Sequence, residues 1–304
     1  MGYNRPEAKR LAKQAMRNTV PHPMLVTLVY VLLTSVLAYL VSMLVANPFI
    51  TFYYYVVDRS YEIHDLVRVL LTPRSVALYG LVQLLLTVFG WIMAFGYNSY
   101  TLRMARNEQP GYQNLLDGFR TLGRAFLVNL LITIFINLWS LVLLVPAFVV
   151  LGVAAMVESG GLILLAVLLL LAGAVLSVVI SYRYRLAVYF LLDNPDMGAL
   201  ASITASKRAM TGWKGELFIQ DLSFLGWYVL VAVVSGLAGG LGVLFGPGAV
   251  GLLTVLVSAA FGLWLTPYVW GTEANFYDWV VRGRYSWQPP AGPDSGYQSP
   301  YGGF

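Results

Sequence analysis

Residues Leu162–Tyr182, with the sequence LILLAVLLLLAGAVLSVVISY, contain no Asp, Glu, Lys, Arg or His. A helix of this length, rising by about 1.5 Å per residue, can cross about 30 Å of hydrocarbon. Five further runs have the same character: Met24–Ala46, Val76–Leu102, Ala125–Val157, Leu222–Phe245 and Ala249–Thr272. Because backbone amides in lipid must be hydrogen-bonded within their own segment, these runs predict six transmembrane helices.

The composition of the whole chain agrees with this prediction. Of the 304 residues, 59% are hydrophobic and 11% are charged, whereas a soluble domain carries about 25% charged residues. The predicted fold is an all-α polytopic transmembrane helical bundle, with six spans arranged as three hairpins and a cytoplasmic amphipathic helix before each hairpin. Cysteine is absent, which excludes disulfides, thiolate metal sites and cysteine nucleophiles.

The positively charged residues between the runs indicate the orientation. Sixteen of the nineteen Lys and Arg residues lie before the first run, in 103–124, in 183–216 or after 281. The other three lie between the first two runs. By the positive-inside rule, both termini face the cytoplasm in a multi-pass protein of the cytoplasmic membrane. We interpret the net charge of +5 as a signal for insertion and lipid contact, not for nucleic-acid binding.

Three parts of the chain differ in composition. Residues 1–23 are basic and are predicted to form a cytoplasmic amphipathic helix, and residues 24–281 hold the six spans. The first run follows a long basic segment and lacks a small-residue cleavage pattern, so we expect it to remain in the mature protein. Residues 282–304 are rich in Pro, Gly and aromatic residues, which predicts a disordered or extended cytoplasmic tail.

Each predicted hairpin follows a segment with helical periodicity. In the first segment the apolar stripe consists of Ala8, Leu11, Ala12, Ala15 and Met16. In the second it consists of Leu115, Leu116, Phe119 and Leu122. In the third, Asn194 can cap a helix that Pro195 begins and Gly212 ends. The sequences AKQAM at 12–16 and SKRAM at 206–210 are similar. This similarity favours three internal repeats of roughly 90 to 100 residues. The alternative is a chance match of common residue types.

The basic faces of these segments are candidates for lipid contact. The first helix is expected to lie flat on the cytoplasmic leaflet, with its apolar side in the acyl boundary and its bases on headgroups. The candidate contacts for anionic headgroups are Lys9, Arg10, Lys13, Arg17, Arg183, Arg185 and Lys207.

A few polar residues lie in or beside the predicted spans. The candidate polar membrane site comprises Gln83, Asn129, Asn137, Asp221 and Glu273. Asp221 is placed at the N-terminus of the fifth span, where it is either a proton or cation site or a partner of the helix dipole or of Lys214. Glu273 follows Pro267, which can disturb the end of the sixth span, and is the second candidate for such a site.

The sequence offers no catalytic constellation. The two histidines, His22 and His64, are predicted on opposite faces of the membrane, and no His-Glu-x-x-His spacing occurs. An enzyme needs acid, base or metal ligands gathered on one side. We therefore expect no catalytic residues, no metal, no cofactor and no enzymatic activity.

Three distinctive motifs lie between Tyr182 and Trp227. They are DNP at 193–195, SKRAMTGWK at 206–214 and LSFLGW at 222–227. In these motifs the chain resembles the bacterial DUF975 membrane family, and weaker similarity extends over most of Arg5–Val281. Pro146 is followed by Ala147, where the family pattern favours glycine, so the resemblance does not support a turn there. It implies a multi-span bacterial membrane protein with no established activity.

Three functions remain open on the sequence. The first is a non-enzymatic membrane scaffold or accessory protein that recruits a protein partner through its cytoplasmic helices or tail. The second is a small transporter or channel with a path between the three hairpins. The third is a lipid-binding or lipid-handling protein, because the basic helices suit anionic headgroups. A homo-oligomer is compatible with all three, and nucleic acid is not an expected partner.

Overall fold

The computed structural model describes residues 3–45, 47–49, 72–283 and 285. Ala46, His64 and residues 286–304 of the predicted tail lie outside this part of the chain. Within the described part the secondary structure is helical, without strands. Six segments are long and apolar enough to cross a membrane: Pro23–Ser42, Pro73–Ala105, Leu122–Val157, Gly160–Asp193, Lys214–Phe245 and Ala249–Arg282. The predicted all-α class and the six apolar spans are confirmed.

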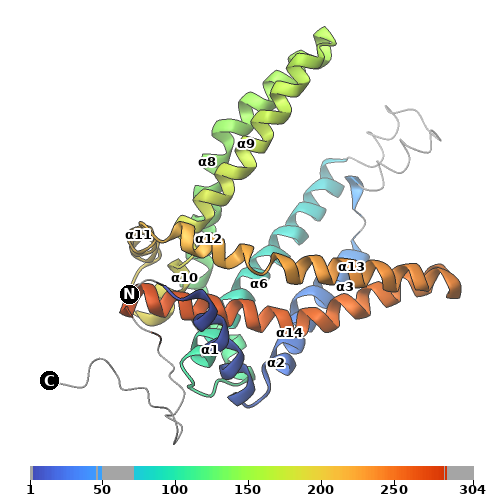
Figure 1. The fold of residues 1–304 in the computed structure, drawn as a ribbon. Coiled ribbons are helices and arrows are strands. Elements are labelled where there is room, and N and C mark those ends of the chain that lie inside the picture. Colours follow the sequence, from blue (N-terminus) through green and yellow to red (C-terminus); the bar gives the residue numbers. More distant parts are fainter. Residues whose placement is uncertain (1–2, 46, 50–71, 284, 286–304) are drawn as a thin grey trace, which may run out of the picture.

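The apolar helices diverge from a common junction (Figure 1). α8 and α9 run side by side in one arm, α13 and α14 in another, and α6 extends in a third direction. We call the junction the hub; it comprises residues 3–19, 92–121, 180–224, 264–283 and 285. The bounds of the arm elements are α2 Pro23–Val31, η1 Leu32–Val36, α3 Leu37–Leu44, α6 Pro73–Ala105, α8 Leu122–Val157, α9 Gly160–Tyr184, α13 Leu225–Gly242, η3 Val243–Phe245 and α14 Pro247–Arg282.

Small residues and hydroxyl groups join α8 to α9. A Cβ added to Gly173 of α9 would lie 3.5 Å from the Cβ of Leu143. The hydroxyls of Ser140 and Ser177 are 2.7 Å apart and share a hydrogen bond. Glu158 between the helices has a φ of 49°, so the chain reverses through a left-handed residue. Such contacts hold helices together in hydrocarbon, where burial of apolar surface gives little preference for protein over lipid.

The backbones of α13 and α14 approach still more closely. A Cβ added to Gly242 would lie 2.6 Å from the Cα of Val250. The hydroxyls of Ser235 and Ser258 are 2.9 Å apart and share a hydrogen bond. Gly246, with a φ of 102°, makes the turn between the two helices. This arm therefore depends on the absence of a side chain at position 242.

Gly242→Ala is expected to destabilise this arm. The new methyl group would collide with the backbone of Val250, so the free energy of unfolding should fall by about 1–3 kcal/mol. Gly240→Ala is the matched control, because nothing lies within 4 Å of an added Cβ there and alanine favours a helix over glycine by about 0.5–1 kcal/mol. Thermal unfolding of both variants in one detergent measures the difference. Equal melting temperatures would contradict the close contact.

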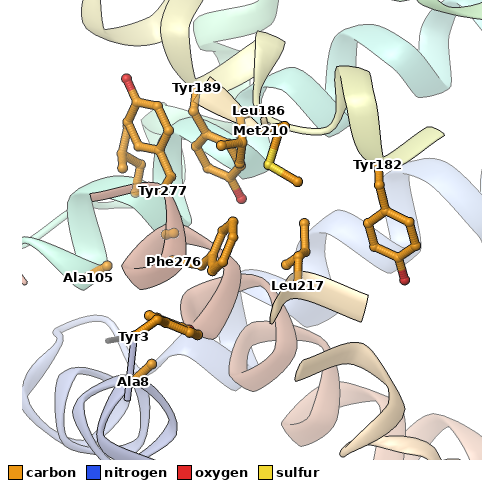
Figure 2. Close-up of a cluster of buried hydrophobic side chains, with 12 residues drawn as sticks. Tyr3, Ala8, Ala105, Tyr182, Leu186, Tyr189, Met210, Leu217, Phe276 and Tyr277 are labelled. Atoms are coloured by element: carbon orange, nitrogen blue, oxygen red, sulfur yellow. The ribbon is translucent and has the colours of Figure 1, made fainter. Parts of the chain in front are cut away.

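The buried aromatic core lies in the hub and not along the arms. The largest fully buried side chains include Tyr97, Tyr100, Tyr189, Phe224, Phe276 and Tyr277. In Figure 2, Phe276 of α14 lies between Tyr3 and the side chains of the 180–217 segment; its ring meets that of Tyr3 edge to face, with centroids 5.0 Å apart. The Tyr285 hydroxyl donates a hydrogen bond to the carbonyl oxygen of Asn4 at 2.7 Å. The two ends of the described chain are thus packed together.

Three spans run further into the hub than predicted. The sequence placed the ends of spans two, four and six at residues 102, 182 and 272. In the structure α6 and α14 continue to Ala105 and Arg282, and the fourth span is followed by α10 (Ala187–Asp193). The predictions stopped at the first charged residue, but a charge does not end a helix when a partner neutralises it. Arg185 and Glu273 do this for each other.

The first predicted amphipathic segment forms α1 (Arg5–Asn18), but its apolar side is covered by protein and not by an acyl boundary. Asn275 of α14 donates a hydrogen bond to the Ala8 carbonyl oxygen at 3.0 Å, and Ala12 lies close to Gly271. The residues of the predicted stripe are all buried: Ala8, Leu11, Ala12, Ala15 and Met16. The expectation was wrong because helical periodicity does not distinguish a protein surface from lipid.

The second predicted amphipathic helix is divided into two short elements. They are η2 (Tyr112–Leu116) and α7 (Asp117–Arg120), after which α8 begins. The division places the Asp117 carboxylate where it accepts hydrogen bonds from Ser99 at 2.6 Å and from Asn114 at 3.0 Å. Only Leu115 of the predicted stripe is buried. These side-chain hydrogen bonds compete with a continuous helix.

The third predicted helix begins later than the sequence indicated. Asn194 does not cap its N-terminus but follows the last residue of α10, where Arg124 donates a hydrogen bond to the Asn194 carbonyl oxygen at 3.1 Å. The next helices are α11 (Ala199–Ala209) and α12 (Lys214–Leu222). α11 already ends at Ala209, before the predicted stop, and Gly212, with a φ of 85°, lies in the turn that leads to α12.

Candidate functional site

A buried arginine joins the ends of three spans. Arg106 follows α6 and makes a two-pronged ion pair with Asp193 at the end of α10, with N–O distances of 2.6 and 2.8 Å. It also donates to Asp278 of α14 at 2.7 Å. The side chain of Asp278 is 0% exposed and that of Arg106 is 12% exposed. Tyr277 donates its hydroxyl hydrogen to Asp193 at 2.9 Å.

The protonation state of Arg106 follows from these partners. Burial alone would lower the pKa of its guanidinium, but the hydrogen bonds and charges of Asp193 and Asp278 outweigh burial and raise that pKa above its ordinary value. Arg106 therefore stays charged, and the planar guanidinium offers enough donors for two carboxylates at once.

A second charged cluster lies in the same hub and contains two of the predicted site residues. Arg185 donates to Glu273 at 2.7 and 3.0 Å in another two-pronged pair. Tyr182 donates its hydroxyl hydrogen to Asp221 at 2.9 Å. The hub thus brings Asp221 and Glu273 into one region, and each has a hydrogen-bonding partner from the end of α9.

The predicted surroundings of Asp221 differ from those in the structure. The sequence placed it at the N-terminus of span five, with the helix dipole or Lys214 as a partner. It lies instead in the last turn of α12, ahead of the break that precedes α13, where the dipole does not favour a negative charge. In the described part of the chain, Lys214 forms no ion pair with Asp221; the partner is Tyr182.

The other predicted polar residues lie along the arms, apart from this cluster. Asn129 and Asn137 of α8 each donate to a carbonyl oxygen of their own helix, Ala125 and Thr133, both at 2.8 Å. Gln83 is half-buried in α6. The structure does not bring these three residues together with Asp221 and Glu273.

The predicted lipid contacts fall into two groups. Lys9, Arg10 and Lys13 line one pocket beside α12 and α14. The others lie elsewhere: Arg17, Arg183, Arg185 and Lys207. Of these, Arg185 is engaged by Glu273, which makes it a structural ion-pair residue as much as a surface base.

Sequence reasoning missed the Arg106 cluster. Arg106 was counted only as an orientation signal, and Asp193 only as part of a motif. Tyr277 and Asp278 received no role. The one available signal was position. Arg106, Asp193 and Asp278 follow the predicted ends of spans two, four and six, respectively. Nothing in the local sequence says that they meet.

The residues that match a known protein family include all of this hub except Tyr285. The chain matches the family described as "Protein of unknown function (DUF975)" over residues 1–283. The chain belongs to the DUF975 family. The earlier resemblance is thereby confirmed, and the DUF975 match contains all six spans together with Arg106, Asp193 and Asp278. No curated protein and no solved structure matches the chain. Since the DUF975 description names no activity, a function has to be argued from the geometry.

Proposed function

We propose that this protein is a non-enzymatic scaffold of the bacterial cytoplasmic membrane, with three hairpins held by a cytoplasmic hub. The distribution of Lys and Arg supports the orientation, since sixteen of nineteen lie on one side. The contacts of Tyr285 with Asn4 support placing both termini on the same side. The paired arms α8–α9 and α13–α14 supply two hairpins, and α2–α3 with α6 would supply the third.

One observation carries the scaffold proposal: the arginines of the two hub clusters, Arg106 and Arg185, are bound by acidic side chains of the same hub. Arg106 bridges Asp193 and Asp278, and Arg185 binds Glu273. A catalytic or transport site keeps polar groups available for a ligand. Here the same groups are used to fix the ends of helices, which suits a protein whose task is to hold surfaces in position.

The arms supply the surfaces that such a scaffold would present. Large apolar side chains are exposed along them, for example Leu141, Phe148 and Leu168 on the α8–α9 arm. These faces suit lipid, a second copy of the chain or another membrane protein. A protein partner on the hub side would contact the cytoplasmic helices or the tail after Tyr285.

The transporter alternative depends on Asp221 and Glu273 facing a hydrated path. Reconstitution into liposomes tests it directly. The scaffold proposal expects fluxes of ions and small metabolites equal to those of empty vesicles. A saturable flux that is lost in Glu273→Gln but retained in the peripheral variant Glu108→Gln would overturn the scaffold and favour the transporter.

The scaffold proposal is tested by identifying the proteins that lie near this chain in native membranes. Proximity labelling from the N-terminus is expected to mark a reproducible set of membrane proteins that differs from the set around an unrelated six-span protein of equal abundance. Truncation should follow Tyr285, because an earlier end would remove the contacts of Arg282 with Asp193 and of Tyr285 with Asn4. Loss of neighbours on truncation assigns recruitment to the tail, and retention assigns it to the helices. Identical sets for the protein and the unrelated control would contradict a scaffold.

A further inference from the structure

A pocket of about 600 Å³ opens beside α1, between that helix and the junction of α12 with α14. Its charged residues are all basic. The lining residues are Arg5, Pro6, Lys9, Arg10, Lys13, Ile219, Ser223 and Tyr268. Arg5, Lys9 and Lys13 are spaced four residues apart, so they lie along one face of α1. The pocket is separate from the Arg106 and Arg185 clusters.

Two of the four bases already have acidic partners. Arg10 pairs with Glu7 at 2.6 Å, and Arg5 pairs with Glu216 at 3.4 Å. Among the residues that the structure describes, Lys9 and Lys13 have no carboxylate within 4.0 Å. Burial, and next the charge of Lys13, lower the pKa of the Lys9 ammonium. An anion between the two lysines would relieve this repulsion.

The two lysines are held in place by the rest of the protein. The Lys9 ammonium donates to the Ser223 carbonyl oxygen at 3.2 Å and lies 4.1 Å from the centre of the Phe224 ring. The Lys13 ammonium lies 5.0 Å from the centre of the Tyr268 ring. A lysine has three donor hydrogens, so the Lys9 contact with Ser223 leaves two for a ligand. Positioned donors lose little entropy on binding.

The surroundings of the pocket are those of a membrane interface. Trp264 packs on Tyr268 with ring centroids 5.1 Å apart, and Trp227 packs on Trp264 at the same distance. Such aromatic groups gather at headgroup depth. Ile219 of the lining is apolar and exposed, as are Leu222 at the end of α12 and Leu225 at the start of α13. A ligand that fits both parts has an anionic group joined to hydrocarbon.

We propose that this pocket binds the phosphate of an anionic phospholipid from the leaflet beside the hub, with Lys9 and Lys13 as its principal contacts. Arg5 and Arg10 surround the phosphate at greater distance, and the acyl chains follow the apolar strip of α12 and α13. Inorganic phosphate shares the anionic chemistry but makes no use of that strip. The site is independent of the scaffold role, because it requires only that the hub borders a bilayer.

The test uses the full-length protein in a zwitterionic detergent. Phosphatidylglycerol, phosphatidylcholine with the same acyl chains, and inorganic phosphate are added separately, and bound lipid is counted by native mass spectrometry while thermal stability is followed. Phosphatidylglycerol is expected to bind most tightly and to be displaced by salt. The double variant Lys9→Gln/Lys13→Gln should weaken its binding by roughly tenfold or more.

The control variant Arg120→Gln/Arg208→Gln removes the same charge from two exposed positions outside the pocket and should retain binding. Lys9→Arg/Lys13→Arg keeps the charge and should retain most of it. If the double glutamine variant melts early without lipid, Lys13→Gln alone replaces it, because that side chain is exposed. Equal phosphatidylglycerol binding by the wild type and the pocket variants would overturn the proposal. Stabilisation by phosphate with no preference for the anionic lipid would likewise overturn it.

Discussion

Arg106→Leu is expected to lower the free energy of unfolding by about 3–5 kcal/mol. The substitution removes the cation that lies 2.6–2.7 Å from Asp193 and Asp278 and leaves them the more distant Arg282, at 3.9 and 3.8 Å. Removing one member of a buried ion pair is costly because the remaining charge keeps its desolvation penalty. Unfolding by denaturant or heat in a single detergent measures the loss.

Two further variants separate the ion pairs from a general effect of charge. Arg106→Lys keeps the charge but replaces a planar group that serves two carboxylates, so an intermediate loss is expected. Glu108→Ala breaks the pair with Arg103, whose members are 4.0 Å apart and about half exposed, and should cost about 1 kcal/mol or less. If Arg106→Leu were as stable as the wild type, the cluster would not hold the hub together.

Gly96→Ala is expected to have the second-largest effect, a loss of about 3 kcal/mol at the upper end of the range for overpacking. A Cβ added to Gly96 of α6 would lie 2.0 Å from the carbonyl oxygen of Leu115 in η2. The obstacle is backbone, which cannot rotate aside as a side chain can. The connection from α6 to α8 would have to move, so faster proteolysis near the exposed Arg120 should accompany the lower melting temperature.

Gly90→Ala on the same helix is the control, because nothing lies within 4 Å of an added Cβ there. Alanine at that position should stabilise the helix by about 0.5–1 kcal/mol. The two substitutions are chemically identical, so opposite signs can come only from what surrounds each glycine. Equal effects of the two variants would show that η2 does not pack on α6 as described.

The spans could be predicted from sequence because hydrocarbon imposes a local rule. A segment such as Leu162–Tyr182 must be long, apolar and free of charge, and each of these properties can be counted within the segment itself. The turn at Gly212 was predictable for the same reason, since a positive φ favours glycine, although α11 ends three residues earlier at Ala209. These features need no knowledge of the rest of the chain.

The hub could not be predicted in this way, because its contacts join distant positions. Arg106 meets Asp193 87 positions later and Asp278 172 positions later. No local sequence pattern indicates that residues so far apart are paired. A single sequence also gives no covariation between positions from which the contact could be inferred. The prediction that the apolar side of α1 faces lipid failed for a different reason: an apolar stripe suits lipid and the surface of α14 equally well. The only hint was the small size of Ala8, Ala12 and Ala15, which suits close contact between helices.

The contact between the segment before α1 and the end of α14 has a consequence for biosynthesis. Tyr3 leaves the ribosome before Phe276, Trp279 and Tyr285, and its ring packs on all three. Every span must therefore be inserted before the N-terminal segment finds its final neighbours. Until then Arg106 has Asp193 but not Asp278, so the ion pairs that join the helix ends are completed only after α14 has been made.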